Sequence, residues 1–350
     1  MKKNRFLFLS LFFASLFCFE SCSSDVDIYA DYKEITVIYG LLDAKVDTNY
    51  IKINKAILGP GNALQIAQEE DSCLYPGKLN ARIVEYITYG WNNTQVQGRV
   101  IPLDTITIHN KKPGVFYAPD QLVYYTAQPF FTNTVNPNTG SVFEKFKYVL
   151  EVEVNDSLIT SSTDIVGGET FGITTGALNF DNNGAETSKV SWFPCPNADV
   201  YDMEFRFYFT EIGPSHDSVR RCMTWKLGTH NTNDLTLNHN TYSLTYKKAL
   251  FFNYLAMFLG SDTLNTNVER VFFEPSLEIF MAAGGEELNN YISVNGPSSS
   301  LVQSIPEYTN IEGGYGVFSS RTTLSKRVPL SGQTIPMLIN REHWRFRQGR

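Results

Sequence analysis

Residues 201–209 read Tyr-Asp-Met-Glu-Phe-Arg-Phe-Tyr-Phe, and this stretch decides the fold class. Its odd-numbered positions are all large and apolar, whereas Asp202, Glu204 and Arg206 occupy even-numbered positions. An alternation of period two places one set of side chains in a core and the other set in solvent, which is typical of a half-buried β-strand. Residues 148–154 (YVLEVEV) alternate in the same way and predict a second such strand.

Further strands are expected along the first half of the chain, at residues 35–41, 50–56 and 81–86. Short strands separated by Gly, Asn and Pro turns favour β-sandwiches. We therefore expect a mainly β fold with two sandwich domains of the immunoglobulin or fibronectin type. The first would span residues 28–165 and the second residues 166–340, with Gly167-Gly168 at the boundary.

One stretch of the second domain favours a helix. Residues 247–260 are rich in Ala, Leu and Met, and Gly260 stands where a helix C-cap is expected. A buried strand is the alternative, because the segment is apolar nearly all round. Residues 286–291 predict a second short helix. The second domain thus combines a sandwich with an inserted helix.

The N-terminal residues have the pattern of an export signal. Three basic residues, Lys2, Lys3 and Arg5, precede an apolar run of 14 residues from Phe6 to Phe19. This run is shorter than the roughly 20 residues that span a bilayer, and it fits a signal-peptide core. Residues 1–21 are therefore predicted to be a signal peptide.

Residues 19–22 (Phe-Glu-Ser-Cys) resemble a bacterial lipobox, in which Cys22 is acylated after the peptide is cleaved. The alternative is an ordinary secretory signal with a cysteine nearby. Residues 22–27 would be a lipidated tether, and two or more acyl chains hold a protein stably at a membrane. Asp25 and Asp27 resemble the acidic signal for export to the bacterial cell surface, and a short solvated tether is the alternative. We expect an outer-membrane lipoprotein facing outward, with the periplasmic face as the alternative.

Composition restricts the class of partner. Aromatic residues make up 14% of the chain and charged residues 19%, which indicates large cores rather than disorder. Cleavage before Cys22 leaves 26 basic and 35 acidic side chains, a net charge of −9. Nucleic-acid binding needs a basic face and is disfavoured. The three remaining cysteines allow a Cys195–Cys222 disulfide, but we favour buried thiols, which behave as small hydrophobes.

Two segments resemble known proteins. Residues 189–192 (KVSW) and 197–201 (NADVY) resemble the B and C strands of a fibronectin type III sandwich, in which Trp192 is a core residue and Tyr201 leads the next strand. Residues 310–318 (NIEGGYGVF) resemble a signature of Bacteroidota surface lipoproteins classed as domains of unknown function. The resemblance implies a β-sandwich followed by a fibronectin-like domain, and an association with outer-membrane transport systems. It implies no particular activity.

The second motif contains Asn310, Gly313, Gly314, Gly316 and Phe318. Glycine permits positive φ and close approach of the backbone. The motif predicts either a binding loop or a tightly packed turn with Phe318 as its core anchor, and we favour the turn.

Four aromatic residues are candidates for ligand binding: Tyr89 and Trp91 in one turn, and Phe130 and Phe131 at the start of a long loop. Exposed rings stack on sugars, and loops on rigid sandwiches often carry function. The alternative is that these rings cover the core.

Two further features suggest surface roles. Four tripeptides match the Asp-Ser/Thr-aliphatic pattern of O-glycosylation in Bacteroidota, with acceptors Thr105, Ser157, Ser218 and Thr263. Residues 341–350 form a basic tail that would either contact anionic lipid or a partner, or remain solvated.

Motifs of metal-dependent, serine-dependent or nucleotide-dependent catalysis are absent, so no metal, cofactor or catalytic residue is predicted. The leading hypothesis is a non-enzymatic envelope lipoprotein that binds a protein partner or nutrient near an outer-membrane transporter. A structural or adhesive surface subunit is the alternative, and a glycan-active enzyme is the least favoured.

Overall fold

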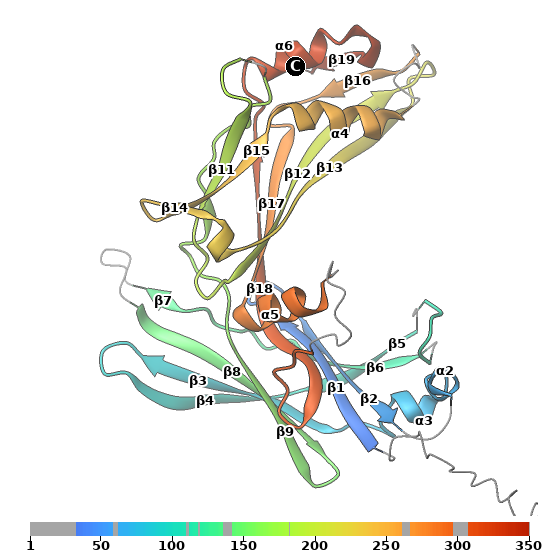
Figure 1. Ribbon diagram of the computed structural model, residues 1–350, viewed down its shortest axis with the longest axis vertical. Coiled ribbons are helices and arrows are strands. Elements are labelled where there is room, and N and C mark those ends of the chain that lie inside the picture. Colours follow the sequence, from blue (N-terminus) through green and yellow to red (C-terminus); the bar gives the residue numbers. More distant parts are fainter. Residues whose placement is uncertain are drawn as a thin grey trace, which may run out of the picture.

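The computed structural model describes residues 33–58, 62–109, 112–117, 120–135, 142–181, 183–260, 267–296 and 307–349. The predicted signal peptide, Cys22 with its tether, and the glycosylation acceptor Thr263 lie outside the described residues. Two lobes follow each other along the long axis of the molecule (Figure 1). Each lobe encloses its own hydrophobic core.

The first lobe is a sandwich of two sheet layers around one core. One layer contains β1 (Lys33–Leu42), β2 (Asn49–Leu58), β6 (Gln121–Thr126) and β5 (Asp104–Ile108). The other contains β4 (Thr94–Pro102), β3 (Asn80–Tyr89), β8 (Val142–Val154), β7 (Thr134–Val135) and β9 (Ser157–Asp164). Two single-turn helices, α2 (Ala63–Ile66) and α3 (Glu70–Cys73), lie between β2 and β3. Both layers bury alternate apolar side chains in the same core, as Ile38 of β1 and Leu150 of β8 do.

The second lobe is also a sandwich. One layer contains β12 (Val200–Ile212), β13 (Ser218–Asn231), β16 (Glu269–Phe272), β17 (Leu277–Gly284) and β19 (Phe346–Gln348). The facing layer contains β10 (Gly172–Ile173), β11 (Thr187–Phe193), β15 (Thr241–Lys247) and β14 (Thr236–Asn238). Trp192 of β11 and Tyr201 of β12 are both buried, and they lie in different layers, with ring centroids 5.4 Å apart.

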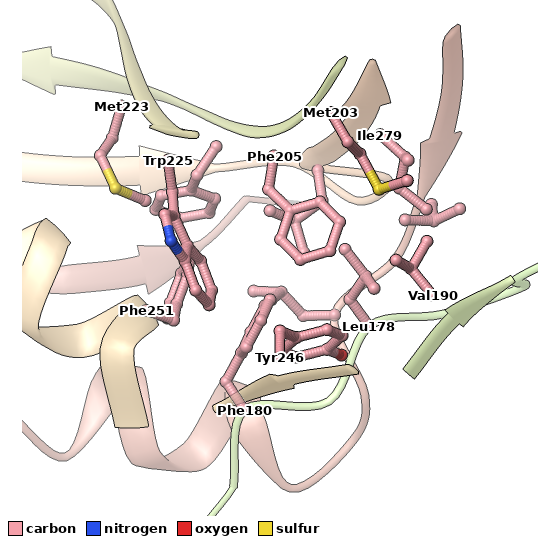
Figure 2. Close-up of a cluster of buried hydrophobic side chains, with 14 of the residues drawn as sticks. Leu178, Phe180, Val190, Met203, Phe205, Met223, Trp225, Tyr246, Phe251 and Ile279 are labelled. Atoms are coloured by element: carbon pink, nitrogen blue, oxygen red, sulfur yellow. The ribbon is translucent and has the colours of Figure 1, made fainter. Parts of the chain in front are cut away.

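Aromatic rings fill the second core. Figure 2 shows Trp225, Phe205, Tyr246, Phe180 and Phe251 gathered between the two layers. The rings of Phe180 and Phe251 stack with centroids 4.2 Å apart and an interplanar angle of 7°. Phe251 belongs to α4 (Ala249–Leu259), the helix that closes one side of this core. The expected helix in residues 247–260 is therefore present.

A single long strand joins the two lobes. The first half of β18 (Gly314–Val328), residues 314–320, pairs in parallel with β1, and the second half, residues 321–328, pairs antiparallel with β17. The strand thereby makes one ten-stranded sheet that runs through both lobes (Figure 1). The helix α5 (Glu286–Asn295), the second helix expected from the sequence, packs on β18.

Residues 307–320 were expected in the second domain, but they pack with the first. Ile311 and Phe318 are buried in the first core. The side chain of Asn310 replaces a missing strand beside β18: its amide nitrogen donates to the carbonyl of Phe318 at 2.6 Å, and its oxygen accepts the N–H of Phe318 at 3.0 Å. Gly316 has a φ of +114°, and a Cβ there would lie 2.0 Å from the carbonyl oxygen of Ile38. The motif is a packed structural element in this fold.

The C-terminal residues are not a free tail. Trp344 and Phe346 are buried in the second core, where β19 pairs with β16 beyond α6 (Thr334–Ile339). The guanidinium of Arg341 lies over the Trp344 ring at 4.7 Å, and Arg347 pairs with Glu269. The prediction of a solvated tail was wrong because two aromatic side chains anchor this segment.

The three described cysteines, Cys73, Cys195 and Cys222, are free thiols. No Cys195–Cys222 disulfide forms, in agreement with the favoured prediction.

Candidate functional site

A cleft of about 490 Å³ lies on the outer face of the ten-stranded sheet, where the first lobe meets β18 and α5. Its walls include Tyr39 of β1, Tyr50 of β2, Tyr291 of α5, Asp43 of the β1–β2 loop and Arg321 of β18. We call it the tyrosine cleft. Its volume lies within the range of about 300–1,000 Å³ that is usual for small-ligand sites.

Strand alternation places two of the rings in the cleft. Ile38 and Leu42 of β1 are buried in the first core, so Tyr39 between them faces outward and is 43% exposed. In β2, Ile51 and Ile53 point inward, and Tyr50 faces outward with 52% of its surface exposed. Tyr39 and Tyr50 belong to paired strands rather than to loops, so their backbone loses little conformational entropy when a ligand binds.

Tyr291 meets Tyr39 across the cleft. The ring centroids are 6.1 Å apart with an interplanar angle of 79°, and a hydrogen bond of 3.4 Å joins the two hydroxyl groups. This hydrogen bond, together with burial, raises the pKa of Tyr39 to about 12. Tyr39 is therefore a neutral phenol at physiological pH, with an apolar face and a polar end.

The rim of the cleft is a tightly bonded turn between β1 and β2. The backbone N–H of Asp43 donates to the side-chain oxygen of Asn49 at 2.7 Å, and the Asn49 amide donates to the Asp43 carbonyl at 3.1 Å. The Lys45 ammonium donates to the carbonyl of Thr323 in β18 at 2.9 Å. Hydrogen bonds within the turn and one to β18, the strand that joins the lobes, thus hold the turn in place.

The charged groups of the cleft differ in their surroundings. Asp43 is buried, and one of its carboxylate oxygens accepts the backbone N–H of Lys45 at 2.9 Å. Arg321 is exposed and forms no ion pair within the described part of the chain. Its cross-strand partner in β17 is Gly284, which has no side chain to cover it.

The four aromatic residues predicted from sequence lie elsewhere and differ among themselves. Trp91 is 69% exposed at the turn between β3 and β4, and its ring stacks on Tyr89 with centroids 4.4 Å apart. It does not cover the core. Phe131 is 46% exposed, and the Arg99 guanidinium lies 4.5 Å from its ring centroid.

Phe130 is a core residue, so its prediction as a ligand-binding side chain was wrong. It is only 4% exposed and packs edge-on against Tyr148, with ring centroids 4.8 Å apart. Adjacent residues of an extended segment point to opposite sides, so Phe130 and Phe131 cannot both face solvent. The loop is held in place because the Tyr148 hydroxyl accepts the N–H of Phe131 at 2.8 Å.

Three predicted glycosylation acceptors are described. Ser157 and Ser218 are exposed at the turns of the β8–β9 and β12–β13 hairpins, and Thr105 is half-buried on β5 at the edge of the large sheet. Accessible hydroxyls at hairpin turns are compatible with modification, which stays a prediction.

Sequence reasoning missed the tyrosine cleft. The alternation in residues 35–41 and 50–56 already placed Tyr39 and Tyr50 on the outward face, and this signal could have identified them. Nothing local distinguished Tyr291 or Arg321, because their part in the cleft depends on where α5 and β18 return to the first lobe.

Comparisons with protein-family models and with curated proteins find no match for this chain. Among the described residues, no group of histidine, cysteine or acidic side chains is arranged to hold a metal ion. None of the helices in the described ranges has the length and apolar character needed to cross a membrane.

Proposed function

We propose that this protein is a lipoprotein of the bacterial outer membrane, anchored through Cys22 and facing the medium, that binds carbohydrate in the tyrosine cleft. The observation that carries the proposal is the set of three tyrosines on rigid elements around one cleft. Tyrosine offers a rigid ring with an apolar face and a hydroxyl, at little cost in conformational entropy. The C–H face of a sugar ring packs on such a surface while its hydroxyls find polar partners.

The proposed activity is binding of the carbohydrate without its chemical conversion. Glycoside hydrolysis uses two carboxyl groups that flank the scissile bond. Asp43 is the single carboxylate among the described residues that line the cleft. A binding lipoprotein of this kind would capture a nutrient glycan at the cell surface and present it to an outer-membrane transporter.

A glycan microarray tests the carbohydrate proposal, using the lipid-free chain from residue 28 onward. We expect binding to a limited group of glycans, reduced at least about tenfold by Tyr39→Ala and by Tyr50→Ala, because each ring contributes stacking and buried area. Tyr315→Ala is the matched control: Tyr315 is also exposed on β18 but does not line the cleft. An array without signal, or equal loss in all three variants, would refute the proposal.

The anchor and its orientation are tested separately. Cys22→Ala should abolish incorporation of labelled palmitate, and protease added to intact cells should degrade the wild-type protein. Full protection from protease would place the protein on the periplasmic face. Mild detergent extraction of the lipidated protein, followed by mass spectrometry, should recover the transporter.

The stacked Trp91–Tyr89 pair favours a second candidate function, adhesion to a protein surface. A largely exposed Trp at a hairpin turn resembles an interface anchor, since Trp and Tyr dominate binding energy in protein interfaces. Trp91→Ala should leave glycan binding unchanged. Loss of cell adhesion in Trp91→Ala, with glycan binding intact, would support this role.

A further inference from the structure

The charge and backbone arrangement of the tyrosine cleft restrict the class of ligand that it can take. The inference below rests on the proposed function and deepens it.

The floor of the cleft offers side chains but little free backbone edge. β1 is paired with β18 and β2 on its two sides, and β2 is also paired with β6 at Asn49–Ile51. Residues 314–320 of β18 pair only with β1, but on their other side Asn310 bonds both backbone groups of Phe318 and the Gly285 N–H donates to the Ser320 carbonyl. A peptide that binds by strand addition needs an unpaired edge. The ligand is therefore recognised through rings, hydroxyls, the carboxylate of Asp43 and the guanidinium of Arg321, which favours a saccharide over an extended peptide.

Arg321 differs from the other arginines whose contacts define the fold. Arg99 binds Glu85 through two nitrogens, at 3.0 and 2.6 Å, and the buried Arg270 binds Glu211 at 3.0 Å. Those guanidinium groups have carboxylate partners within the protein. Arg321 lies in the cleft without one in the described ranges, and its cross-strand neighbour is Gly284. Its planar fork of donors is geometrically suited to a carboxylate on the ligand.

Long-range electrostatics would otherwise oppose an acidic ligand. The mature chain carries a net charge of −9, so an anionic sugar is attracted only where a local cation outweighs the overall field. The cleft places that cation among three tyrosine rings, and a raised pKa keeps the Tyr39 phenol uncharged. The one carboxylate among the described lining residues, Asp43, is buried and accepts the backbone N–H of Lys45. Stacking on the sugar face and pairing with its carboxylate are thus available within one cleft.

We propose that the tyrosine cleft binds saccharides that carry a carboxylate, namely uronic acid units, with the carboxylate held by Arg321 and the sugar rings packed on Tyr39, Tyr50 and Tyr291.

Titration calorimetry at low and moderate salt tests this proposal with three probes: trigalacturonate, trimannuronate and a hyaluronan tetrasaccharide. Each is paired with its carboxyl-reduced, neutral counterpart. We expect at least one acidic probe to bind about ten- to a hundredfold more tightly than its neutral counterpart, since a hydrogen bond to a charged group has this magnitude. Arg321→Met should abolish the difference, Arg321→Lys should restore part of it, and added salt should weaken only the acidic probe.

The matched control is Arg327→Met. Arg327 is exposed on the same strand and the same face, but its guanidinium lies over Tyr208 at 3.8 Å and outside the cleft. We expect this variant to bind all probes as the wild type does. Equal loss in Arg327→Met and Arg321→Met would overturn the assignment of Arg321.

Other outcomes separate this inference from the proposed function. Equal binding of acidic and neutral probes, with no effect of Arg321→Met, would overturn the inference and leave carbohydrate binding standing. If the wild type binds none of the probes and no glycan on the array, both the inference and the proposed function are refuted. Arg321-dependent binding of acetyl-trialanine, but of no sugar, would show that a peptide carboxylate is the ligand.

Discussion

Asn310→Ala should destabilise the first lobe because the Asn310 side chain forms hydrogen bonds with both backbone groups of the buried Phe318. The Asn310 amide donates to the Phe318 carbonyl at 2.6 Å and accepts the Phe318 N–H at 3.0 Å. Alanine removes both partners and leaves a buried donor and a buried acceptor unsatisfied. Each such group costs about 1–3 kcal/mol, so the free energy of unfolding should fall by about 2–6 kcal/mol.

Urea denaturation followed by far-ultraviolet circular dichroism measures this loss. With an m-value of about 2 kcal/mol/M, the midpoint should fall by about 1–3 M. Asn310→Asp separates hydrogen bonding from packing. It keeps an acceptor for the Phe318 N–H but places a second carboxylate oxygen against the Phe318 carbonyl, so we expect a loss at least as large.

The control is Asn238→Ala, because Asn238 is exposed on β14. Surface changes of this kind stay within about 0.5 kcal/mol. The reasoning is refuted if Asn310→Ala is as stable as the control, or if Asn310→Asp is as stable as the wild type.

Three other predictions concern folding. Gly316→Ala combines a strained φ with a backbone clash and should give no soluble folded protein, whereas Gly332→Ala, where a Cβ meets nothing within 4 Å, should fold normally; yield and circular dichroism decide. Phe130→Ala should lower the free energy of unfolding by about 3–5 kcal/mol and Phe131→Ala by less than about 1 kcal/mol, measured by denaturation; equal losses would contradict the assigned burial. Burial raises the pKa of Glu287 more than hydrogen bonds to its carboxylate lower it. The folded chain therefore binds more protons than the unfolded chain, and the free energy of unfolding falls as pH rises from about 4 through the raised pKa. The stability of Glu287→Gln relative to the wild type should therefore increase over this range, and a constant difference from pH 4 to 7 would contradict the assignment.

Local patterns in the sequence identified β1, β2, β3, β8, β12 and both longer helices, but not β13 and β18, which are the longest strands of the described residues. The alternation in residues 201–209 depends only on whether successive side chains face core or solvent, which the strand period dictates. The observed β12 bounds, Val200–Ile212, contain that stretch, and α4 lies within the residues expected to be helical. The burial of Trp192 also followed from its place in an apolar pattern.

Tertiary structure alone decided which strands are neighbours. A parallel pairing such as that of Thr36 with Gly314 joins segments far apart in the chain, and no local signal specifies it. The same pairing carries residues 307–320 into the first lobe and brings Arg321 into one cleft with Tyr39 and Tyr50. The sequence by itself therefore determined the strongly alternating strands, the two longer helices and their buried faces, because these depend on neighbours a few residues away. The cleft required the three-dimensional arrangement, because its rings and its cation come from four separate elements that only the folded sheet brings together.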